Sequence, residues 1–462
     1  MPMPPTRRGA AAARLAAAVA AATAAGLAGC TTDALEVTSP DVITPDAVNN
    51  AAGATAVRNG AVRDFTVVYS GTQDGFIVAT GNMADEINAT DTFFDRLLPN
   101  ERNTDRNLPV QDTYYTNLHR ARAGAGRAIR QWAQVKPVTG ATPANVAARD
   151  SLGELYALRG YTESFFGETY CAGVPFSDEV DGAITYGDPL TTAQTFQRAV
   201  ASFDTALANA TTAANRGLAS VGRARALLNL GRFADAAAAV AAVPTTFRYQ
   251  TYHSAATAAQ FNGVWNGLSV PSARYAATTN EGTNGYNFLQ TPADPRMPWA
   301  PSTRVGFDGS SRNLPTQLKY PTNASPATLA DGVEARLIEL EARLQGGAQA
   351  DRDAVFAGLN SLRATAITPA MAALPGAAPA TQAAAVDQFF RERAAWLWLT
   401  GHRLGDMRRL IRQYGRAANT VFPVGPVATR AGSTYGTDVN YPIPFVESNN
   451  PKAQGGCIDR GA

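Results

Sequence analysis

Residues 226–236 read Ala-Leu-Leu-Asn-Leu-Gly-Arg-Phe-Ala-Asp-Ala. A helix is expected to end near Gly231, because glycine commonly follows the last helical residue. A second helix is expected to begin within a few residues. Small alanine side chains would let the two helices pack closely. The segment therefore predicts an antiparallel helical hairpin.

Helical periodicity continues on both sides of this hairpin. Thr191 and Gln194 have the spacing of a capping box and open a helix with an apolar stripe. Further upstream, helices are expected over residues 47–65, 114–135 and 149–170, and another after residue 66 leads into an irregular loop over 93–108. Downstream, apolar stripes predict helices over residues 333–344, 355–362 and 386–404, the last broken near Gly401 or Gly405.

Residues 245–325 have a different composition and interrupt the helical pattern. Gly, Pro, Asn, Thr and Tyr dominate, and no long period survives. The stretch is too aromatic for disorder, and its rings are Phe247, Tyr249, Tyr252, Phe261, Trp265, Tyr275, Tyr286, Phe288 and Trp299. We expect ordered loops with short strands. The predicted scaffold is therefore helical over 46–244 and 326–413, with a loop-rich insertion over 245–325 and a coil tail over 414–462.

The hairpin at residues 226–236 is similar to a tetratricopeptide repeat. The match is good for one repeat and weak for a regular array. A generic antiparallel helix pair is the alternative. Both give the same fold class: mainly α, a helical repeat scaffold with a large irregular insertion.

The N-terminus has the pattern of a targeting signal. Arg7, Arg8 and Arg14 precede an almost wholly apolar run over residues 15–29, which is shorter than the roughly 20 residues that a spanning helix needs. The run ends in Leu-Ala-Gly-Cys, similar to a bacterial lipobox. Residues 1–29 are therefore predicted to be a signal peptide, Cys30 a lipidation site, and 30–45 a tether. The alternative is an ordinary secretory signal with Cys30 beyond its cleavage site.

The other two cysteines are Cys171 and Cys457. If Cys30 carries lipid, these two remain in an oxidising compartment, and the count favours a disulfide between them. Two buried free thiols are the alternative.

Charge and motifs exclude several classes of function. The formal charge is +2 for the whole chain, and it falls to about −1 when the three arginines of the signal peptide are removed, which argues against a nucleic-acid partner. The three histidines lie far apart, so neither a metal site nor a cofactor is predicted. No nucleophile elbow or phosphate-binding loop is present. Asp85 and Glu86 could serve a glycosidase, but we expect them to be solvated charges.

Several short motifs follow one another in order along nearly the whole mature chain. The clearest reads Glu-Arg-Ala-Ala-Trp-Leu over residues 392–397, followed by Gly-His-Arg-Leu-Gly-Asp-Met-Arg-Arg over 401–409. The others lie at residues 156–175, 294–296, 336–342, 359–363 and 441–451. Together they resemble the SusD/RagB family of nutrient-binding outer-membrane lipoproteins. Trp396-Leu397-Trp398 departs from the family, which usually has Glu-Leu there.

The resemblance implies a tetratricopeptide-like scaffold with a loop-rich ligand face. Proteins of this family act as an extracellular lid over a SusC-like TonB-dependent transporter in the outer membrane and capture an oligosaccharide or a peptide. They make and break no bond, so the chain is not expected to be an enzyme. The charged residues of the main motif have helical spacing and are expected to form ion pairs that hold the fold, and they are Glu392, Arg393, Arg403, Asp406 and Arg409.

The ligand candidates come from the physical chemistry of sugars. Aromatic rings can contact the apolar CH faces of a sugar, and polar side chains can bond its hydroxyls. The candidates are Trp265, Tyr275, Tyr286 and Trp299, with Asn82 and Asp91 as polar ones. The alternative is that these rings only pack the loops onto the helices. Two other functions stay open at this point: an envelope scaffold without a small ligand, and a surface glycan hydrolase.

Overall fold

The computed structural model describes residues 49–136, 138–180, 182–279 and 281–462. The predicted signal peptide, Cys30 and the tether to residue 45 lie outside these ranges. None of the described helices is long and apolar enough to cross a membrane.

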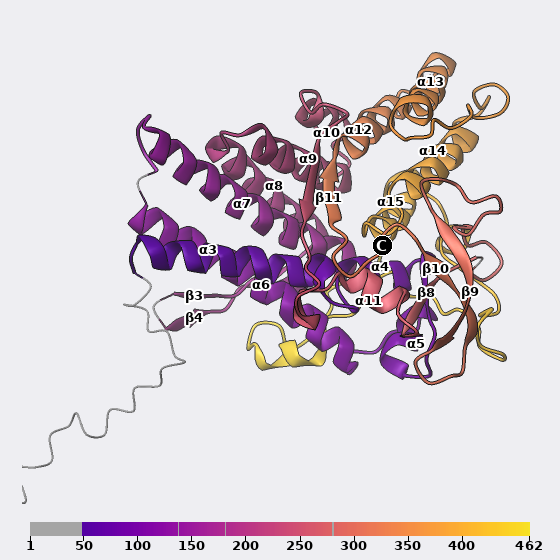
Figure 1. Ribbon diagram of the computed structural model, residues 1–462, viewed down its shortest axis with the longest axis horizontal. Coiled ribbons are helices and arrows are strands. Elements are labelled where there is room, and N and C mark those ends of the chain that lie inside the picture. Colours follow the sequence, from indigo (N-terminus) through magenta and orange to yellow (C-terminus); the bar gives the residue numbers. More distant parts are fainter. Residues whose placement is uncertain (1–48, 137, 181, 280) are drawn as a thin grey trace, which may run out of the picture. The chain divides into compact units, whose positions relative to one another are not determined.

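Helices dominate the described chain, which confirms the mainly α prediction (Figure 1). Their bounds are α3 (Ala51–Thr66), α4 (Phe76–Met83), α5 (Phe94–Asn100), α6 (Pro109–Val135), α7 (Pro143–Thr169), α8 (Thr192–Asn209), α9 (Ala213–Asn229), α10 (Phe233–Val240), α11 (Gly263–Leu268), α12 (Gly332–Leu344), α13 (Gln349–Thr365), α14 (Gln382–Trp396), α15 (Arg403–Tyr414) and α16 (Ala418–Val421).

The strands are short and form small separate sheets. They are β1 (Ile87–Ala89), β2 (Val174–Pro175), β3 (Asp178–Val180), β4 (Ala183–Thr185), β5 (Pro189–Leu190), β6 (Arg248–Thr251), β7 (Ser272–Ala273), β8 (Tyr275–Ala277), β9 (Trp299–Gly306), β10 (Arg312–Gln317) and β11 (Ala327–Asp331). The largest sheet has the order β10-β9-β7, and the others are the pairs β1-β8, β11-β6, β2-β5 and β3-β4.

The predicted hairpin is formed by α9 and α10. Gly231 stands between them with φ of +72°, a left-handed conformation that glycine adopts without strain. The capping box at the start of α8 is also confirmed: the Gln194 N–H donates to the Thr191 hydroxyl at 3.2 Å, and the Gln194 side chain accepts from the Thr191 N–H at 2.9 Å. These two features form as predicted because the contacts that stabilise them lie within a few residues along the chain.

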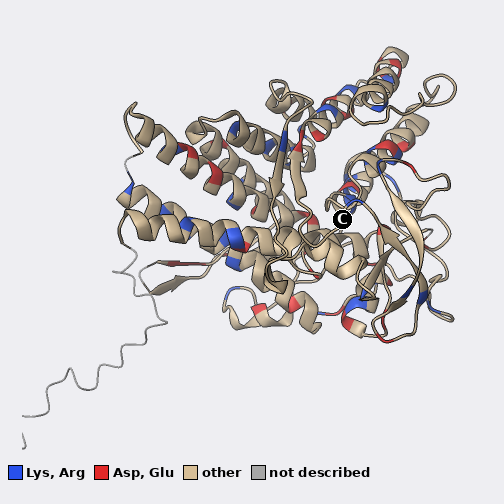
Figure 2. Cartoon of the chain, in the orientation of Figure 1, with Lys and Arg blue, Asp and Glu red and all other residues tan. Residues whose placement is uncertain are grey.

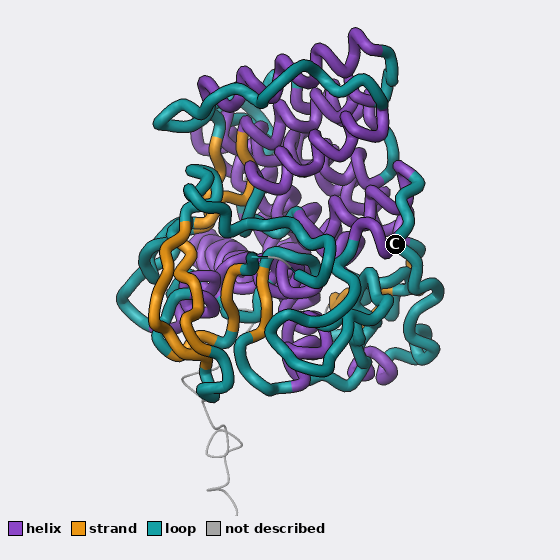
Figure 3. Tube along the Cα trace, turned by 90° about the vertical axis from the view of Figure 1, so that its right-hand side faces the viewer, coloured by secondary structure: helices purple, strands orange, loops and turns teal. Residues whose placement is uncertain are grey.

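The loop-rich insertion begins and ends on one pair of strands. β6 pairs antiparallel with β11, so the chain leaves the helical scaffold and returns at the same place. As a result α10 packs against α12 although residues 241–331 lie between them. In Figure 3 most of the helices gather in the upper part, while the strands and most of the loops lie in the lower part, with further helices among them.

One local prediction was wrong. Residues 93–108 were expected to be an irregular loop, but they contain helix α5. Side-chain bonds to distant parts of the chain stabilise it: Arg96 Nη2 donates to Asp74 at 3.0 Å, and Asn100 accepts from the Ala89 N–H at 3.2 Å. Tertiary contacts here override a weak local helix propensity.

The predicted break at Gly401 is confirmed. Leu399 and Gly401 both have positive φ, +52° and +76°, and they turn the chain from α14 into α15. A Cβ on Gly401 would collide with the ring of Phe76. Gly405, the alternative position, lies inside α15.

The tail that follows α15 lies against the helical body, and it differs from the expected coil by the short helix α16 within it. Tyr441 is 2% exposed and its carbonyl accepts from the Cys171 N–H at 2.9 Å. A disulfide joins Cys171 to Cys457, with their Cα atoms 5.8 Å apart. This is the pairing that the cysteine count favours, and it fixes the end of the tail to the end of α7.

Candidate ligand-binding cleft

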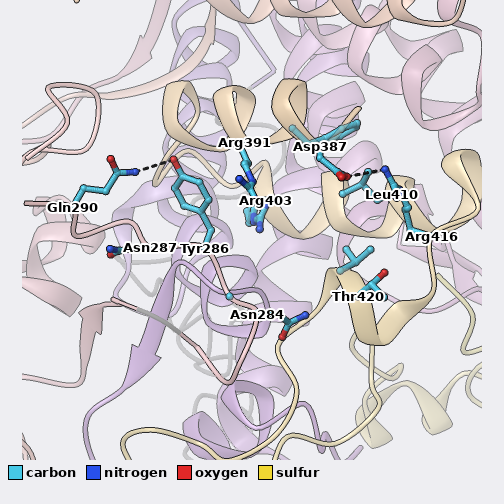
Figure 4. A pocket seen from close by; sticks show the side chains of 13 residues that line it. Asn284, Tyr286, Asn287, Gln290, Asp387, Arg391, Arg403, Leu410, Arg416 and Thr420 are labelled. Atoms are coloured by element: carbon cyan, nitrogen blue, oxygen red, sulfur yellow. Dashed lines mark hydrogen bonds and ion pairs between the residues drawn. The ribbon is translucent and has the colours of Figure 1, made fainter. Parts of the chain in front are cut away.

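A polar cleft of about 610 Å³ lies between the loop at residues 284–290 and the helices α14, α15 and α16 (Figure 4). A second hollow of about 580 Å³ adjoins it and shares four of its lining residues. The shared residues are Tyr286, Gln290, Asp387 and Arg391. The rest of the polar lining is Asn284, Asn287, Arg403, Arg416 and Thr420.

The loop side of the cleft is held in place by bonds to two other segments. The Asn284 amide donates to the Phe422 carbonyl at 3.0 Å and accepts from the Val424 N–H at 3.1 Å. The Tyr286 N–H donates to Asp85 at 2.9 Å. Because its backbone is fixed in this way, the loop presents its side chains without a large entropy cost on binding.

Tyr286 is the aromatic residue of the cleft. Its hydroxyl accepts from the Gln290 amide at 3.1 Å (Figure 4), and its ring packs edge-to-face on Phe288, with centroids 4.7 Å apart. Phe288 in turn stacks on the fully buried Trp398. Partial burial raises the pKa of Tyr286, so the ring is a neutral, supported surface.

The helix side of the cleft is basic. Asp387 and Arg391 are one turn apart on α14 and so lie on the same face. Arg416 donates to Asp387 at 2.7 Å. Arg403 makes two bonds to Asp85, at 2.6 and 2.7 Å. Burial would lower the pKa of Arg403, but the Asp85 carboxylate raises it overall.

Asp85 connects the two sides of the cleft, and the expectation that Asp85 and Glu86 are solvated was wrong. Both are buried, with exposed fractions of 0% and 1%. Asp85 accepts from Arg403 and from the Tyr286 backbone. Glu86 accepts from the Leu399 N–H at 3.1 Å, and burial raises its pKa to about 8. Burial without access from solvent also argues against using this pair as hydrolytic acids.

The six sequence candidates separate into three groups. Tyr286 lines the cleft, and Trp299 supports it, because the Trp299 indole N–H donates to the Gln290 carbonyl at 2.9 Å. Trp265 lies on α11, outside the cleft, and packs against Phe261.

Tyr275, Asn82 and Asp91 form the third group and are buried. The Tyr275 hydroxyl donates to Asp74 at 2.6 Å, Asn82 donates to the Arg96 carbonyl at 2.9 Å, and Asp91 pairs with Arg274 at 2.8 Å. Their exposed fractions are 2%, 2% and 3%. Because these side chains are buried, we assign no ligand contact to them.

The main sequence motif forms the predicted ion pairs. Arg393 bonds Asp406 at 2.7 Å, and Arg409 bonds Asp406 at 2.7 Å and also pairs with Glu341. In the same region Glu392 accepts from Arg296 and Arg363. Acidic and basic residues accordingly lie close together along α12, α14 and α15 (Figure 2).

A third hollow, of about 530 Å³, lies between β11 and the α14–α15 turn. Several of its polar groups are already bonded within the fold. Lys319 donates to the Trp398 carbonyl, Asp331 accepts from the Glu334 N–H at 2.8 Å, and Glu334 pairs with His402 at 2.9 Å. Within the described ranges, no His, Cys, Asp or Glu side chains gather as metal ligands. The cleft at Tyr286 is therefore the better candidate.

Sequence reasoning missed most of the cleft. Asn284, Asn287, Gln290, Asp387, Arg391 and Arg416 were not among the candidates. The Asn-Gly-Tyr-Asn stretch at 284–287 offers one usable signal, because amides beside an aromatic ring suit a sugar. Nothing in the sequence separates Arg391 from the other helical arginines.

No protein-family sequence model matches the chain, and no curated protein sequence is detectably similar to it. Many solved structures do match it. One is a SusD superfamily protein from Parabacteroides distasonis, with a TM-score of 0.63 and 11% identity, covering 89% of this chain and 98% of the other. Another is a SusD-like carbohydrate-binding protein from Bacteroides fragilis, with a TM-score of 0.62 and 12% identity over 88% and 99% of the two chains.

A third match is a laminarin-binding SusD-like protein, with a TM-score of 0.60, 14% identity and coverage of 87% and 98%. The fold of this protein is therefore the SusD-like fold over almost its whole described length. At these identities the match establishes the fold, and the cleft has to be interpreted from its own chemistry.

Proposed function

We propose that this protein is a lipid-anchored surface protein that captures an oligosaccharide in the cleft around Tyr286 and covers a SusC-like TonB-dependent transporter in the outer membrane. It acts by binding and catalyses no reaction. The observation that carries the proposal is the lining of the cleft, where a supported aromatic ring is surrounded by amide and guanidinium groups on a SusD-like fold.

The chemistry of the lining suits a sugar. The ring of Tyr286 can lie against the CH face of a pyranose, and Asn284, Asn287 and Gln290 can donate to and accept from its hydroxyls. The volume of about 610 Å³ is in the usual range for small-ligand sites, roughly 300–1,000 Å³. The adjoining hollow gives room for a second sugar unit.

The binding test uses the mature lipoprotein in detergent and a panel of oligosaccharides and peptides. Tyr286→Ala should weaken binding of the best ligand by about tenfold, because it removes an aromatic contact of roughly 0.5–1.5 kcal/mol together with the apolar area that the ring buries. Tyr186→Ala is the matched control, since Tyr186 is a partly exposed tyrosine that does not line the cleft. If Tyr286→Ala binds as tightly as the wild type, the cleft is not the site.

The partner and the anchor are tested separately. Extraction from native membranes should bring down a TonB-dependent barrel with this protein. Cys30→Ala should release the protein from the membrane fraction. A protein that stays in the membrane after this substitution would contradict lipid anchoring, and capture of no barrel would favour the scaffold alternative.

A further inference from the structure

The cleft described above holds more positive charge than a neutral sugar needs. Arg391, Arg403 and Arg416 come from α14, from α15 and from the turn after α15, and all three line the same space. Asp387 is the only carboxylate among the residues lining the main hollow. Glu392 lines the adjoining hollow, where Arg296 and Arg363 already neutralise it.

The three arginines differ in how firmly they are paired. Arg403 is held by two bonds to the buried Asp85. Arg416 pairs with Asp387, but these side chains are 29% and 56% exposed, and an exposed pair contributes only about 0–1 kcal/mol. Arg391 makes no ion pair or hydrogen bond with any described residue. Its guanidinium therefore has all of its donors free.

The position of Arg391 matters as much as its lack of a partner. In Figure 4 its side chain points from α14 into the cleft, between Tyr286 on one side and the Asp387–Arg416 pair on the other, with Arg403 beside it. A sugar ring lying on Tyr286 would place a ring substituent within reach of Arg391. A guanidinium binds a carboxylate or a sulfate through two parallel N–H bonds, which gives direction as well as charge.

We infer that the ligand of this cleft is an anionic oligosaccharide, in which a uronate carboxylate or a sulfate ester pairs with Arg391. The inference rests on the proposed function and specifies its substrate class. Arg416 can add a second contact, because its pair with Asp387 is weak enough to exchange. Arg403 stays bonded to Asp85 and contributes only the electrostatic attraction of its positive charge to the cleft.

The experiment compares anionic and neutral ligands on the detergent-solubilised lipoprotein by calorimetry. The ligands are oligogalacturonates, sulfated galacto-oligosaccharides, their unsulfated and methyl-esterified counterparts, and inorganic sulfate. The anionic sugars should bind at least about tenfold more tightly than the neutral ones, as expected for a charged hydrogen bond. The two anionic sets show whether the source of the charge is a carboxylate or a sulfate. Raising the salt concentration should weaken the binding of the anionic sugars and leave that of the neutral sugars unchanged.

Arg391→Ala should remove this preference by weakening anionic ligands much more than neutral ones. Arg391→Lys should restore part of the preference, because lysine keeps the positive charge but cannot form the two parallel N–H bonds of a guanidinium. Arg312→Ala is the control for net charge, since Arg312 is an exposed arginine that lines neither hollow. Equal affinity for neutral and anionic sugars, or binding of inorganic sulfate as tight as that of the sugars, would overturn the inference.

The outcomes also separate this inference from the proposed function. Neutral sugars that bind in a Tyr286-dependent but Arg391-independent manner would leave the proposed function standing and remove the anionic ligand. If no sugar, neutral or anionic, binds in a Tyr286-dependent manner, both the proposed function and the anionic ligand are ruled out.

Discussion

Arg391 and Arg393 are two residues apart on α14, yet they belong to regions with opposite physical character. Arg393 is 1% exposed and bonds Asp406, which also accepts from Arg409. Arg391 is exposed in the cleft and has no partner among the described residues. The same helix thus carries a buried ion-pair network on one face and an exposed, unpaired arginine of the cleft on the other.

The difference follows from the cost of removing a charge from water. A buried guanidinium is tolerable only when carboxylates and carbonyls satisfy it. Burial would raise the pKa of Asp406, but Arg393 and Arg409 hold it below its usual range. An exposed guanidinium keeps its water and can exchange it for a ligand. An arginine whose donors are bonded within the fold therefore has a structural role. An arginine with free donors can still bond a ligand.

The largest expected effect comes from breaking the buried network. Arg409→Ala should lower the free energy of unfolding by about 3–5 kcal/mol, because Asp406 and Glu341 lose a shared buried partner. Urea denaturation measures it. If this variant does not fold, Arg409→Lys gives a milder test. A loss below about 1 kcal/mol would show that burial does not distinguish the two regions.

An intermediate effect on stability is expected from buried carboxyl groups that lack a full set of hydrogen-bond partners. Burial raises the pKa of both Glu86 and Glu281 to about 8, well above the ordinary value of 4.5. The folded state then keeps these protons to higher pH than the unfolded state does. Stability should fall as the pH rises toward 8, by up to about 1.4 kcal/mol per pH unit for each carboxyl.

The pH window for this measurement is set by the other titrating groups. Below pH 6.5 the three histidines His119, His253 and His402, whose pKa values desolvation lowers, change stability in the opposite direction. Lys319, with its pKa lowered to about 8, stays largely charged below that pH. Between pH 6.5 and 8, Glu86→Gln should therefore reduce the slope, and the exposed Glu179→Gln should not. Equal slopes in both variants would contradict the assignment.

A smaller effect is expected in the cleft. Arg416→Ala breaks the exposed pair with Asp387 and should cost about 0–1 kcal/mol of stability. Thermal unfolding of this variant beside Arg409→Ala gives the contrast directly. A cost as large as that of Arg409→Ala would make the cleft a structural part of the fold.

The smallest effect is expected for Arg391→Ala. With no partner to lose, the unfolding free energy should stay within about 0.5 kcal/mol of the wild type. The same denaturation assay measures it, and it is also the folding control for the binding experiments. A marked destabilisation would reveal a structural role for Arg391.

Much of the fold could be predicted from local patterns. The α9–α10 hairpin, the capping box at Thr191, the loop-rich insertion and the break at Gly401 all depend on residues close to one another in sequence. Helix α5 could not be predicted, because its stabilising partners, Asp74 and Ala89, lie outside it.

The cleft was less predictable than the fold. Tyr286 was among the candidates, but three of the six candidates are buried and one lies elsewhere. Aromatic composition shows where rings gather in the sequence, and it does not show which rings remain exposed after packing. The helix side of the cleft begins at Asp387, about a hundred residues after Tyr286, and no pattern in the sequence links the two.

The sequence by itself determined the helical scaffold, the position of the insertion and the chemistry available within it, because helix periodicity, capping and glycine turns act over a few residues. Only the tertiary structure decided which charges are buried and which are free. Arg391 and Arg393 are the same residue type in the same helix. Their roles differ because the helix turns one toward Asp406 and the other toward the open cleft.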